Sequence, residues 1–266
     1  MAIIITVSNQ KGGVGKTTTS AALATGISSR GMRVLGIDLD PQGNLGFCLG
    51  LGSSDMPTVL DALKGKIPIG EAIVQTEYCD ILSSDITLSS SGLEKGNSGR
   101  KEYLIHDMLE PVMDKYDYIV IDTPPALNLL TVNAYVVSDF LIIPMASDIL
   151  SLVGLSQLKE TIESVQENLN PELNVLGILL TRFNKRTLLS RDVLEMAQQL
   201  AKQMKTTVFN TKIRNGVAIA EAPAHGESIF DYNPRSSAVK DYQELIDEIA
   251  DRIHLKEAVE YGKENQ

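Results

Sequence analysis

The chain has 266 residues, of which 43% are hydrophobic and 22% charged. This composition is typical of a globular protein with a substantial core, and it excludes a largely disordered chain. No apolar stretch approaches the roughly 20 residues of a membrane-spanning helix. Cys48 and Cys79 form no C-x-x-C motif, so neither a zinc site nor a disulfide framework is expected. We therefore expect a reducing, cytoplasmic location. The net charge of −10 argues at first sight against nucleic acid as a partner.

Short apolar, β-branched runs alternate along the chain with segments of helical period. Several of these runs are apolar throughout, as expected for strands that are covered on both faces. They predict strands at Ile3–Ser8, Arg33–Asp38, Cys79–Ser83, Tyr118–Asp122, Phe140–Met145, Asn174–Thr181 and Thr206–Asn210.

Between the strands, apolar residues at helical spacing predict helices, for example over residues 104–112, 152–165 and 239–253. Strand–helix alternation along the whole chain predicts an α/β fold, a single doubly wound, mostly parallel sheet with helices on both faces. Residues 1–256 are expected to form one domain, and residues 257–266 a polar, disordered C-terminal tail.

The first strand leads into the glycine-rich sequence SNQKGGVGKTTTS (residues 8–20), before a helix that should begin near Lys16. Glycines at positions 12, 13 and 15 would let backbone N–H groups converge on an anion. The N-terminus of the following helix adds a partial positive charge. The segment therefore predicts a phosphate-binding loop.

Individual side chains of the loop fit a nucleotide but depart from the usual pattern. Lys16 would reach the β- and γ-phosphates, and the Thr17 hydroxyl would ligate Mg²⁺. The pattern G-x-x-x-x-G-K-[ST] is broken at its first glycine, which is Gln10 here, and a second lysine, Lys11, follows it. A plain phosphate-binding loop does not need this second lysine.

Two aspartate motifs follow later strands, as a phosphate-binding loop requires of its neighbours. The run YDYIVIDTPP is an apolar strand that ends in Asp122, the position typical of a carboxylate near Mg²⁺. The run VLGIDLDPQGN places Asp38 and Asp40 just past another strand. Carboxylates repel a neighbouring polyanion unless they hold a metal ion or orient a water molecule. Their presence at this place therefore suggests hydrolysis of the bound phosphates. On these residues alone, turn and capping roles stay open.

The charge is unevenly distributed along the chain. Between Thr181 and Lys240, ten Lys and Arg stand against five Asp and Glu, a local net charge of +5, so the other 206 residues carry −15. A local basic surface is therefore compatible with the acidic total. For each of these basic residues alone, a solvated surface position is the alternative to a ligand contact.

Three motifs give the chain a resemblance to a known family. KGGVGKTTT, DLDPQGN and YDYIVIDTPPALNLLTVNA occur in the order and spacing of the ParA/Soj family of chromosome- and plasmid-partitioning ATPases. This family belongs, with MinD, to the deviant Walker A group of P-loop NTPases. GLSQLKETI, LLTRFNKRTLLS and EAPAHGESIFDYNPRSSAVKDY extend the resemblance to about residues 2–250. The first three motifs are specific to the group, and the later ones favour ParA over its relatives.

The resemblance implies roles for the residues of the loop. Lys11 matches the signature lysine that reaches across a nucleotide-sandwich dimer to the phosphates of the other subunit, a cation supplied in trans like an arginine finger. Gly12 matches a position where the two chains approach closely. The implied ATP-binding residues of the loop are Lys11, Gly12, Gly13, Val14, Gly15, Lys16, Thr17 and Thr18.

The resemblance also implies roles for the carboxylates. Asp40 matches the residue that orients the attacking water, so that the implied catalytic residues are Lys11, Lys16 and Asp40. Asp122 matches the carboxylate that supports Mg²⁺. Asp38 is expected to have a secondary role close to the metal ion, so that the implied metal residues are Thr17, Asp38 and Asp122. ATP and Mg²⁺ are the implied cofactors.

In the family, the base pocket is built from the end of the strand carrying LLTRFN and the loop near EAPAHG. Asn184 and Pro223 are the corresponding candidates here, although asparagine in a turn is as often only a turn former.

The family binds duplex DNA through basic residues that hold the backbone without reading sequence. The segment KRTLLSR lies in the family's basic region. Where many relatives read IPRNVRLSEAP, this chain reads IRNGVAIAEAP, so Asn215 and Ala218 replace two arginines. Either nearby basic residues substitute for them or the affinity for DNA is weaker than usual. The candidates for DNA contact are Arg186, Arg191, Lys212 and Arg214.

The implied function is an ATP-driven switch. ATP binding forms a homodimer, the dimer binds double-stranded DNA non-specifically, and a ParB-type centromere-binding partner stimulates the hydrolysis that releases it. The implied location is cytoplasmic and nucleoid-associated, with no membrane partner. Because no extension precedes the first strand, an N-terminal helix-turn-helix domain is not expected.

Three alternatives are kept. A MinD-like membrane-associated positioning ATPase would need a basic amphipathic C-terminal helix, whereas residues 241–266 contain eight Asp and Glu against three Lys and Arg. An iron–sulfur carrier on the same fold would need cysteine spacings that are absent here. A scaffold that binds nucleotide without hydrolysing it is disfavoured by Asp40.

Overall fold

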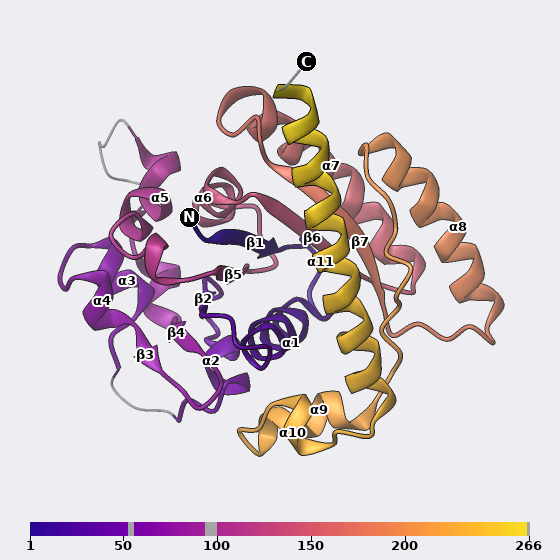
Figure 1. Ribbon diagram of the computed structural model, residues 1–266, viewed down its shortest axis with the longest axis horizontal. Helices are drawn as coiled ribbons and strands as arrows, with labels where there is room; N and C mark the ends of the chain where they lie inside the picture. Colours follow the sequence, from indigo (N-terminus) through magenta and orange to yellow (C-terminus); the bar gives the residue numbers. More distant parts are fainter. Residues whose placement is uncertain (53–55, 94–99, 265–266) are drawn as a thin grey trace.

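The computed structural model describes residues 1–52, 56–93 and 100–264, with side chains described as far as residue 255 except at position 153. In this part of the chain seven strands form one sheet in the order β3-β4-β2-β5-β1-β6-β7 (Figure 1). Neighbouring strands are parallel, except that β3 and β4 are antiparallel. The strands are β1 (Ile3–Val7), β2 (Val34–Asp38), β3 (Val74–Gln75), β4 (Asp80–Leu82), β5 (Tyr118–Asp122), β6 (Phe140–Ala146) and β7 (Asn174–Thr181).

Helices connect the strands and cover both faces of the sheet (Figure 1). The α-helices are α1 (Lys16–Ser28), α2 (Asn44–Cys48), α3 (Val59–Leu63), α4 (Ile69–Ala72), α5 (Leu104–Leu109), α6 (Leu129–Val137), α7 (Ile149–Asn168), α8 (Leu188–Gln203), α9 (Val217–Ala224), α10 (Ile229–Tyr232) and α11 (Ser237–Glu264). Short 3₁₀ helices lie at Ile86–Ser90, Lys101–Tyr103 and Met113–Lys115.

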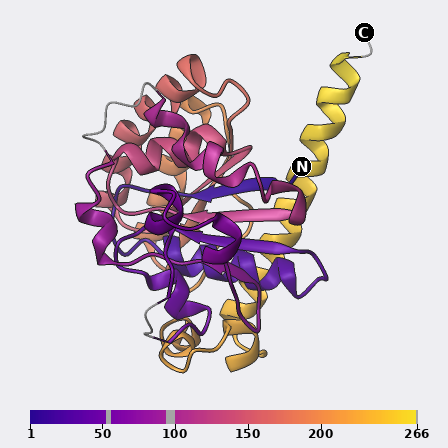
Figure 2. The same ribbon diagram turned by 90° about the vertical axis from the view of Figure 1, so that its left-hand side faces the viewer.

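Two hydrophobic cores lie on the two faces of the sheet. Because side chains alternate between the faces of a strand, Ile119 and Ile121 of β5 enter one core and Val120 enters the other. The first core is closed by α3, α5, α6, α7 and α8, and the second by α1, α2, α9 and α11 (Figure 2). The sheet is therefore covered on both faces, which confirms the prediction of a doubly wound, mostly parallel fold.

The register of the three central strands determines where the loops at their carboxyl ends meet. On β5, Asp122 is level with Val7, the last residue of β1, and with Asp38, the last residue of β2. The glycine-rich loop after β1 and the two aspartates that were predicted to face it therefore lie at one edge of the sheet.

Most predicted strands are present, but the one predicted at Thr206–Asn210 is wrong. This segment runs beside β7 and makes a single isolated bridge between Val208 and Ile178. Side chains of α11 occupy the backbone groups that a longer ladder would use. Arg252 donates to the carbonyl oxygens of residues 176 and 208, and the Glu248 carboxylate accepts from the backbone N–H groups of residues 210 and 211.

The C-terminal helix α11 continues to Glu264 and so includes most of the segment 257–266 that was predicted to be a disordered tail. The side chains of this segment, and residues 265–266 altogether, lie outside the described residues. The single-domain division at residue 256 stays a prediction.

Close packing of α1 on α11 leads to a prediction about two glycines in helix interiors. A Cβ on Gly26 of α1 would overlap Cδ1 of Ile246 and lie 3.0 Å from Cζ of Phe230, whereas a Cβ on Gly154 of α7 would meet nothing within 4 Å. We expect Gly26→Ala to lower the free energy of unfolding by about 1–2 kcal/mol through overpacking. Gly154→Ala should raise it by about 0.5–1 kcal/mol through helix propensity.

Chemical denaturation of the two variants and the wild type checks this expectation. The two substitutions are chemically identical, so a common effect of both on the unfolding midpoint would contradict close packing of α1 against α11.

Candidate active site

The loop between β1 and α1 has the backbone shape of a phosphate-binding loop. Gly13 and Gly15 have φ angles of 71° and 89°, a region that side chains other than glycine rarely adopt. Val14 between them is buried, and its carbonyl oxygen accepts a hydrogen bond of 2.9 Å from the hydroxyl of Thr181 at the end of β7. The loop is therefore held by the sheet on its β7 side.

The start of the loop is held by Asn9. Its Nδ2 donates to the carbonyl oxygen of Pro144 on β6 at 2.7 Å, and its Oδ1 accepts from the backbone N–H of Lys11 at 2.9 Å. Gln10, which stands where the usual motif has glycine, has a buried Nε2 without a hydrogen-bond partner in the described part of the chain.

Lys16 lies folded over its own loop. The side chain is buried, 6% exposed, and Nζ donates to the carbonyl oxygen of Lys11 at 3.2 Å. Burial lowers the pKa of this ammonium group, and the nearby charges of Asp122 and Asp40 act in the opposite direction. The charge of Lys16 therefore lies against the glycine-rich loop.

Lys11 extends in a different direction. Its Nζ forms an ion pair of 2.6 Å with the carboxylate of Asp148 and donates to the hydroxyl of Ser151 at 3.2 Å, at the start of α7. The same carboxylate caps α7 by accepting from the backbone N–H of Ser151, and contact with Lys11 helps to lower its pKa against the opposing effect of burial. The two lysines thus point to different places: Lys16 lies over the loop, and Lys11 contacts the start of α7.

The Asp122 carboxylate is fully buried beneath the start of α1. Its Oδ2 accepts from the Thr17 hydroxyl at 2.7 Å, and its Oδ1 accepts from the Ser20 hydroxyl at 2.9 Å. Burial raises its pKa to about 6, although both hydroxyls and the charge of Lys16 favour the ionised form. Thr17 and Asp122, two of the predicted metal residues, are therefore in direct contact.

Asp38, the third predicted metal residue, shapes the turn that carries Asp40. Its two oxygens accept from the backbone N–H groups of Asp40 and Leu45, both at 2.9 Å. Burial, and then the charge of Asp122, raise the pKa of Asp38 well above its usual value. Asp40 is partly exposed, and its Oδ1 accepts from the backbone N–H of Gln42 at 3.0 Å.

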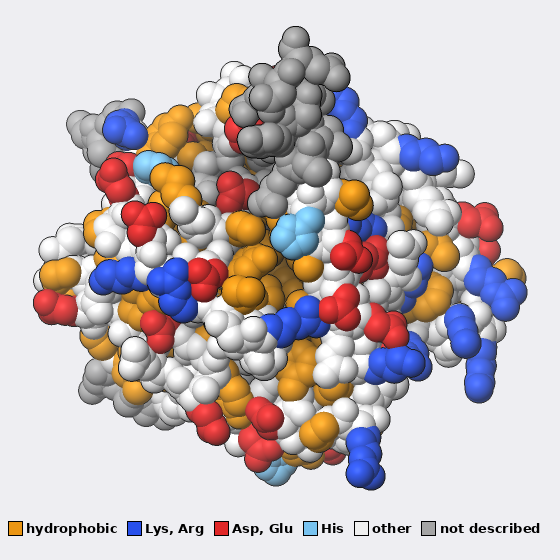
Figure 3. All heavy atoms as spheres, in the orientation of Figure 1, with side chains coloured by type: hydrophobic (Ala, Val, Ile, Leu, Met, Phe, Trp, Pro, Cys, Tyr) orange, Lys and Arg blue, Asp and Glu red, His pale blue; other side chains and the backbone are white. Residues whose placement is uncertain are grey.

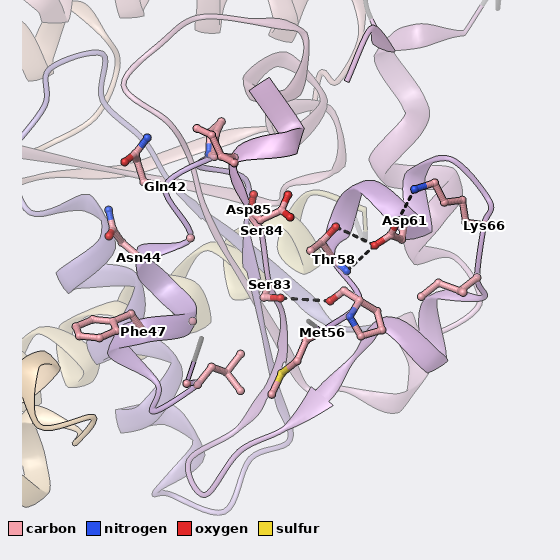
Figure 4. Close-up of a pocket in the computed structure, with 18 residues that line it drawn as sticks. Gln42, Asn44, Phe47, Met56, Thr58, Asp61, Lys66, Ser83, Ser84 and Asp85 are labelled. Carbon is pink, nitrogen blue, oxygen red and sulfur yellow. Dashed lines mark hydrogen bonds and ion pairs between the residues drawn. The ribbon is translucent and has the colours of Figure 1, made fainter. Parts of the chain in front are cut away.

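The turn after Asp40 forms one wall of a cavity of about 1230 Å³ (Figure 4). Gly43 in this turn has a φ of 66°, and a Cβ there would lie 2.7 Å from the carbonyl oxygen of Ser84 on the opposite wall. In Figure 4, Gln42 and Asn44 line the cavity from this turn, and Ser84 and Asp85 line it from the segment after β4. The Asp40 turn is thus fixed at Asp38 and Gly43 but faces open space.

The two base-pocket candidates differ in their surroundings. Pro223 lies in α9 and lines a small cavity together with Thr18 of α1. Asn184 forms a turn, because its Oδ1 accepts from the backbone N–H of Arg186 and its carbonyl oxygen accepts from the Thr187 hydroxyl. The structure brings Pro223 close to α1 and shows that Asn184 forms a turn, and the base-pocket role of both residues stays a prediction.

Lys and Arg side chains gather over the side of the molecule that carries α8 (Figure 3). Of the four DNA candidates, Arg186 and Arg191 are exposed at the start of α8. Arg214 is instead paired with the buried carboxylate of Asp241 at 2.6 Å, and its backbone N–H donates to the same group. Lys212 donates to the carbonyl oxygen of Asn210, and burial lowers its pKa.

Several residues of the site were not predicted from the sequence. Ser20 is one turn beyond the loop motif, and the spacing of four from Lys16 on a helix was the available signal. Asp148 and Ser151 carry the pattern of a helix N-cap, D-x-x-S, but a cap gives no sign that it also binds Lys11, 137 positions away.

The buried carboxylates lead to a prediction about pH. The pKa of Asp122 is raised in the folded chain, so the folded state binds this proton more tightly than the unfolded state does. The folded state is stabilised while Asp122 is protonated, and this stabilisation is lost as the pH rises through about 6. Asn keeps an acceptor for the Ser20 hydroxyl and removes the charge. Without nucleotide or metal, Asp122→Asn should be more stable than the wild type at neutral pH, by up to about 3 kcal/mol.

The measurement is thermal unfolding in a chelating buffer from about pH 5 to about pH 8. The difference in unfolding temperature between the variant and the wild type should widen as the pH rises. Unfolding temperatures that stay parallel across this pH range would contradict a buried Asp122 whose charged form is destabilised.

Comparisons with known proteins agree with this geometry. Residues 2–175 match a protein family described as an AAA domain. The chain is 40% identical over 253 residues to the sporulation initiation inhibitor protein Soj of Bacillus subtilis, covering 94% of this chain and 99% of Soj. It is 37% identical over 260 residues to the chromosome partitioning protein ParA of Caulobacter vibrioides, covering 96% of each.

A solved structure named cobyrinic acid a,c-diamide synthase, from Mycobacterium smegmatis with a bound ATP analogue and magnesium, superposes with a TM-score of 0.80. It has 31% sequence identity, and the match covers 93% of each chain. Together with the glycine-rich loop, the second lysine and the two buried carboxylates, the sequence identity over nearly the whole chain decides the family. The chain belongs to the ParA/Soj family of P-loop partitioning ATPases.

Proposed function

We propose that this chain is an ATP-dependent DNA-partitioning ATPase that works as a homodimer. ATP binding joins two copies face to face, the dimer binds double-stranded DNA non-specifically, and hydrolysis releases it. The observation that carries the proposal is the separation of the two loop lysines. Lys16 is buried over its own loop, whereas Lys11 lies at the rim of the site, 31% exposed.

The residues of the loop fit ATP and Mg²⁺. Gly13 and Gly15 have the left-handed backbone of an anion cradle, and the partnerless buried Nε2 of Gln10 is a donor available to a ligand. No group of three or more His, Cys, Asp or Glu side chains within the described ranges could hold a metal ion. That suits Mg²⁺, which uses one or two carboxylates together with waters and substrate phosphates.

Thr17 and Asp122, with Asp38 behind them, would hold the Mg²⁺, which supplies positive charge that offsets the phosphates. Lys16 adds a second positive charge from a desolvated position, where electrostatic interactions are stronger than in water. Asp40 stands on a turn fixed by the carboxylate of Asp38, and its own partly exposed carboxylate would accept a hydrogen bond from the attacking water. These positions support hydrolysis rather than nucleotide binding alone.

The surface around Lys11 supports the face-to-face dimer. A Cβ on Gly12 would meet nothing within 4 Å, so this stretch of backbone is open to a second chain. The start of α7, where Asp148 and Ser151 contact Lys11, carries large exposed apolar side chains, Ile149 by 59% and Leu150 by 72%. Exposed apolar side chains of this kind are typical of a surface that a second copy buries.

The exposed arginines at the start of α8 support DNA binding. Arg186 and Arg191 are exposed where α8 begins, and Lys and Arg side chains gather over the side of the molecule that carries α8 (Figure 3). Arg214 is held by Asp241 and Lys212 by a backbone carbonyl, so we assign these two residues the smaller part. A ParB-type, centromere-binding partner would stimulate hydrolysis, and the protein would be cytoplasmic and nucleoid-associated.

The MinD-like alternative is the weaker one. The apolar residues of α11 that could have formed a lipid-binding stripe, Ile246, Ile249 and Ile253, are at most 3% exposed and pack in the core. In the described part of the chain no helix combines the length and hydrophobicity needed to cross a bilayer.

The water-orienting role leads to a prediction for Asp40. Asp40→Ala should still bind ATP and form the dimer, while steady-state ATP hydrolysis falls about 100-fold or more, because general-base positioning contributes at least that factor. The dimer is followed by light scattering after gel filtration with ATP, and turnover by phosphate release.

Two variants calibrate this experiment. Asp40→Asn keeps the shape of the side chain and should behave like Asp40→Ala, whereas Lys16→Ala should lose ATP binding itself. Rapid ATP turnover by Asp40→Ala would exclude the role given to Asp40.

The DNA-binding surface leads to a further prediction. Arg186→Ala and Arg191→Ala should weaken binding to two unrelated duplexes alike, and each lost phosphate contact should reduce the salt dependence of binding by about one unit of log–log slope. Lys64→Ala, on an exposed lysine that lies far from α8 (Figure 1), is the matched control.

Binding is measured by mobility shift with ATP, with ADP and without nucleotide. DNA binding by the wild type only with ATP is expected, and binding that is indifferent to nucleotide would contradict the proposed switch. Unaltered affinity of both arginine variants would place the DNA surface elsewhere.

A further inference from the structure

Arg182, which follows β7 directly, has an unusual backbone conformation. Its φ is 50°, in the left-handed region that few residues other than glycine adopt. In the described ranges only one other non-glycine residue has a positive φ, Lys205 at 53°. Such conformations cost free energy and persist only where the surrounding structure imposes them, often at functional sites.

The residues on both sides of Arg182 are anchored. The Thr181 hydroxyl donates to the carbonyl oxygen of Val14 in the phosphate-binding loop, and the backbone N–H of Phe183 donates to the carbonyl oxygen of Ile213 at 2.9 Å. Arg182 is therefore held at a fixed place between the loop and the segment that follows α8. Its backbone conformation is imposed by contacts on either side.

The side chain of Arg182 reaches the neighbourhood of the phosphate-binding loop. A Cβ built on Gly13 would lie 3.9 Å from Nη2 of Arg182. The residue is exposed, and no carboxylate within the described ranges forms an ion pair with it. An exposed guanidinium group, without an ion pair among the described residues, thus lies near Gly13 of an anion-binding loop.

The order of the strands indicates which end of the nucleotide Arg182 faces. The predicted metal and water-orienting residues follow β5 and β2, on one side of β1, whereas β6 and β7 lie on the other side. A nucleotide that lies across the strand ends with its terminal phosphate toward Asp40 and Asp122 extends its α-phosphate and ribose away from β2, toward β7. Arg182 stands at the end of β7.

We propose that Arg182 binds the α-phosphate and ribose end of the nucleotide held by its own loop. This inference rests on the proposed ATPase function and adds to it a contact in cis, distinct from Lys16 and Lys11. A guanidinium presents several donors in a planar fork and suits a phosphate oxygen or a ribose hydroxyl.

A contact at this end has a kinetic signature. ADP and ATP share the α-phosphate and the ribose, so loss of Arg182 should weaken both nucleotides equally. A contact that is the same in the ground state and the transition state changes KM and leaves kcat unaltered. A contact to the terminal phosphate, in cis or in trans, would instead discriminate ATP from ADP or lower kcat.

The experiment measures the affinities of wild type, Arg182→Ala and Arg182→Gly for ADP and for ATP by calorimetry, together with kcat and KM. We expect Kd to rise about 10- to 100-fold for both nucleotides in both variants, the range for a lost charge-assisted hydrogen bond. Arg182→Lys, which keeps the charge without the fork, should recover part of the loss.

Two controls separate the side chain from the backbone. Glycine adopts a φ of 50° without strain, so normal affinity in Arg182→Gly combined with a loss in Arg182→Ala would mean that only the backbone matters, and would overturn the proposal. Lys205→Ala removes a cation from the same backbone conformation at the end of α8 and should bind both nucleotides like the wild type.

The remaining outcomes are also decisive. Unchanged Kd values in both Arg182 variants, a loss confined to ATP, or a fall in kcat would each overturn the proposed contact while leaving the ATPase function intact. Failure of the wild type to bind either nucleotide would overturn the proposed function itself.

Discussion

The Asp122 carboxylate joins the elements that make the active site. It ends β5, lies level with the last residues of β1 and β2, and accepts hydrogen bonds from Thr17 and Ser20 of α1. Because these hydroxyls stand one turn apart, the carboxylate sets the direction in which α1 leaves the loop. Its burial is unfavourable for a charge, as its raised pKa shows. The folded chain therefore maintains a site that a cation would stabilise.

Asp38 extends this arrangement to the turn that carries Asp40. Both of its oxygens are used by backbone N–H groups, so it acts on Asp40 through the shape of the turn rather than through direct contact with a ligand. The far end of the turn is held at Gly43, against the carbonyl oxygen of Ser84. Beyond it lies the cavity of Figure 4 rather than packed core. The turn is thus held at both ends, and Pro41 and Gln42 between them line the cavity.

Local patterns predicted what depends on local sequence. The apolar runs gave β1, β2 and β5, and the loop motif gave the start of α1 at Lys16. Distant polar pairings could not be predicted in this way. Asp148 pairs with Lys11, and Asp241 with Arg214, because the fold brings α7 and α11 to those lysine and arginine side chains. The missing strand near Val208 has the same cause, since the competing Arg252 comes from α11.

The pairing of Lys11 with Asp148 also bears on how two copies could engage. Both side chains are partly exposed, by 31% and 43%, and ion pairs at such positions contribute only about 0–1 kcal/mol. In the proposed dimer, Lys11 would leave this ion pair to reach the nucleotide of the second subunit, and it would lose little by doing so. Asp148 would keep its role as the cap of α7, because it also accepts from the backbone N–H of Ser151. The weak, partly exposed ion pair is thus compatible with the role proposed for Lys11.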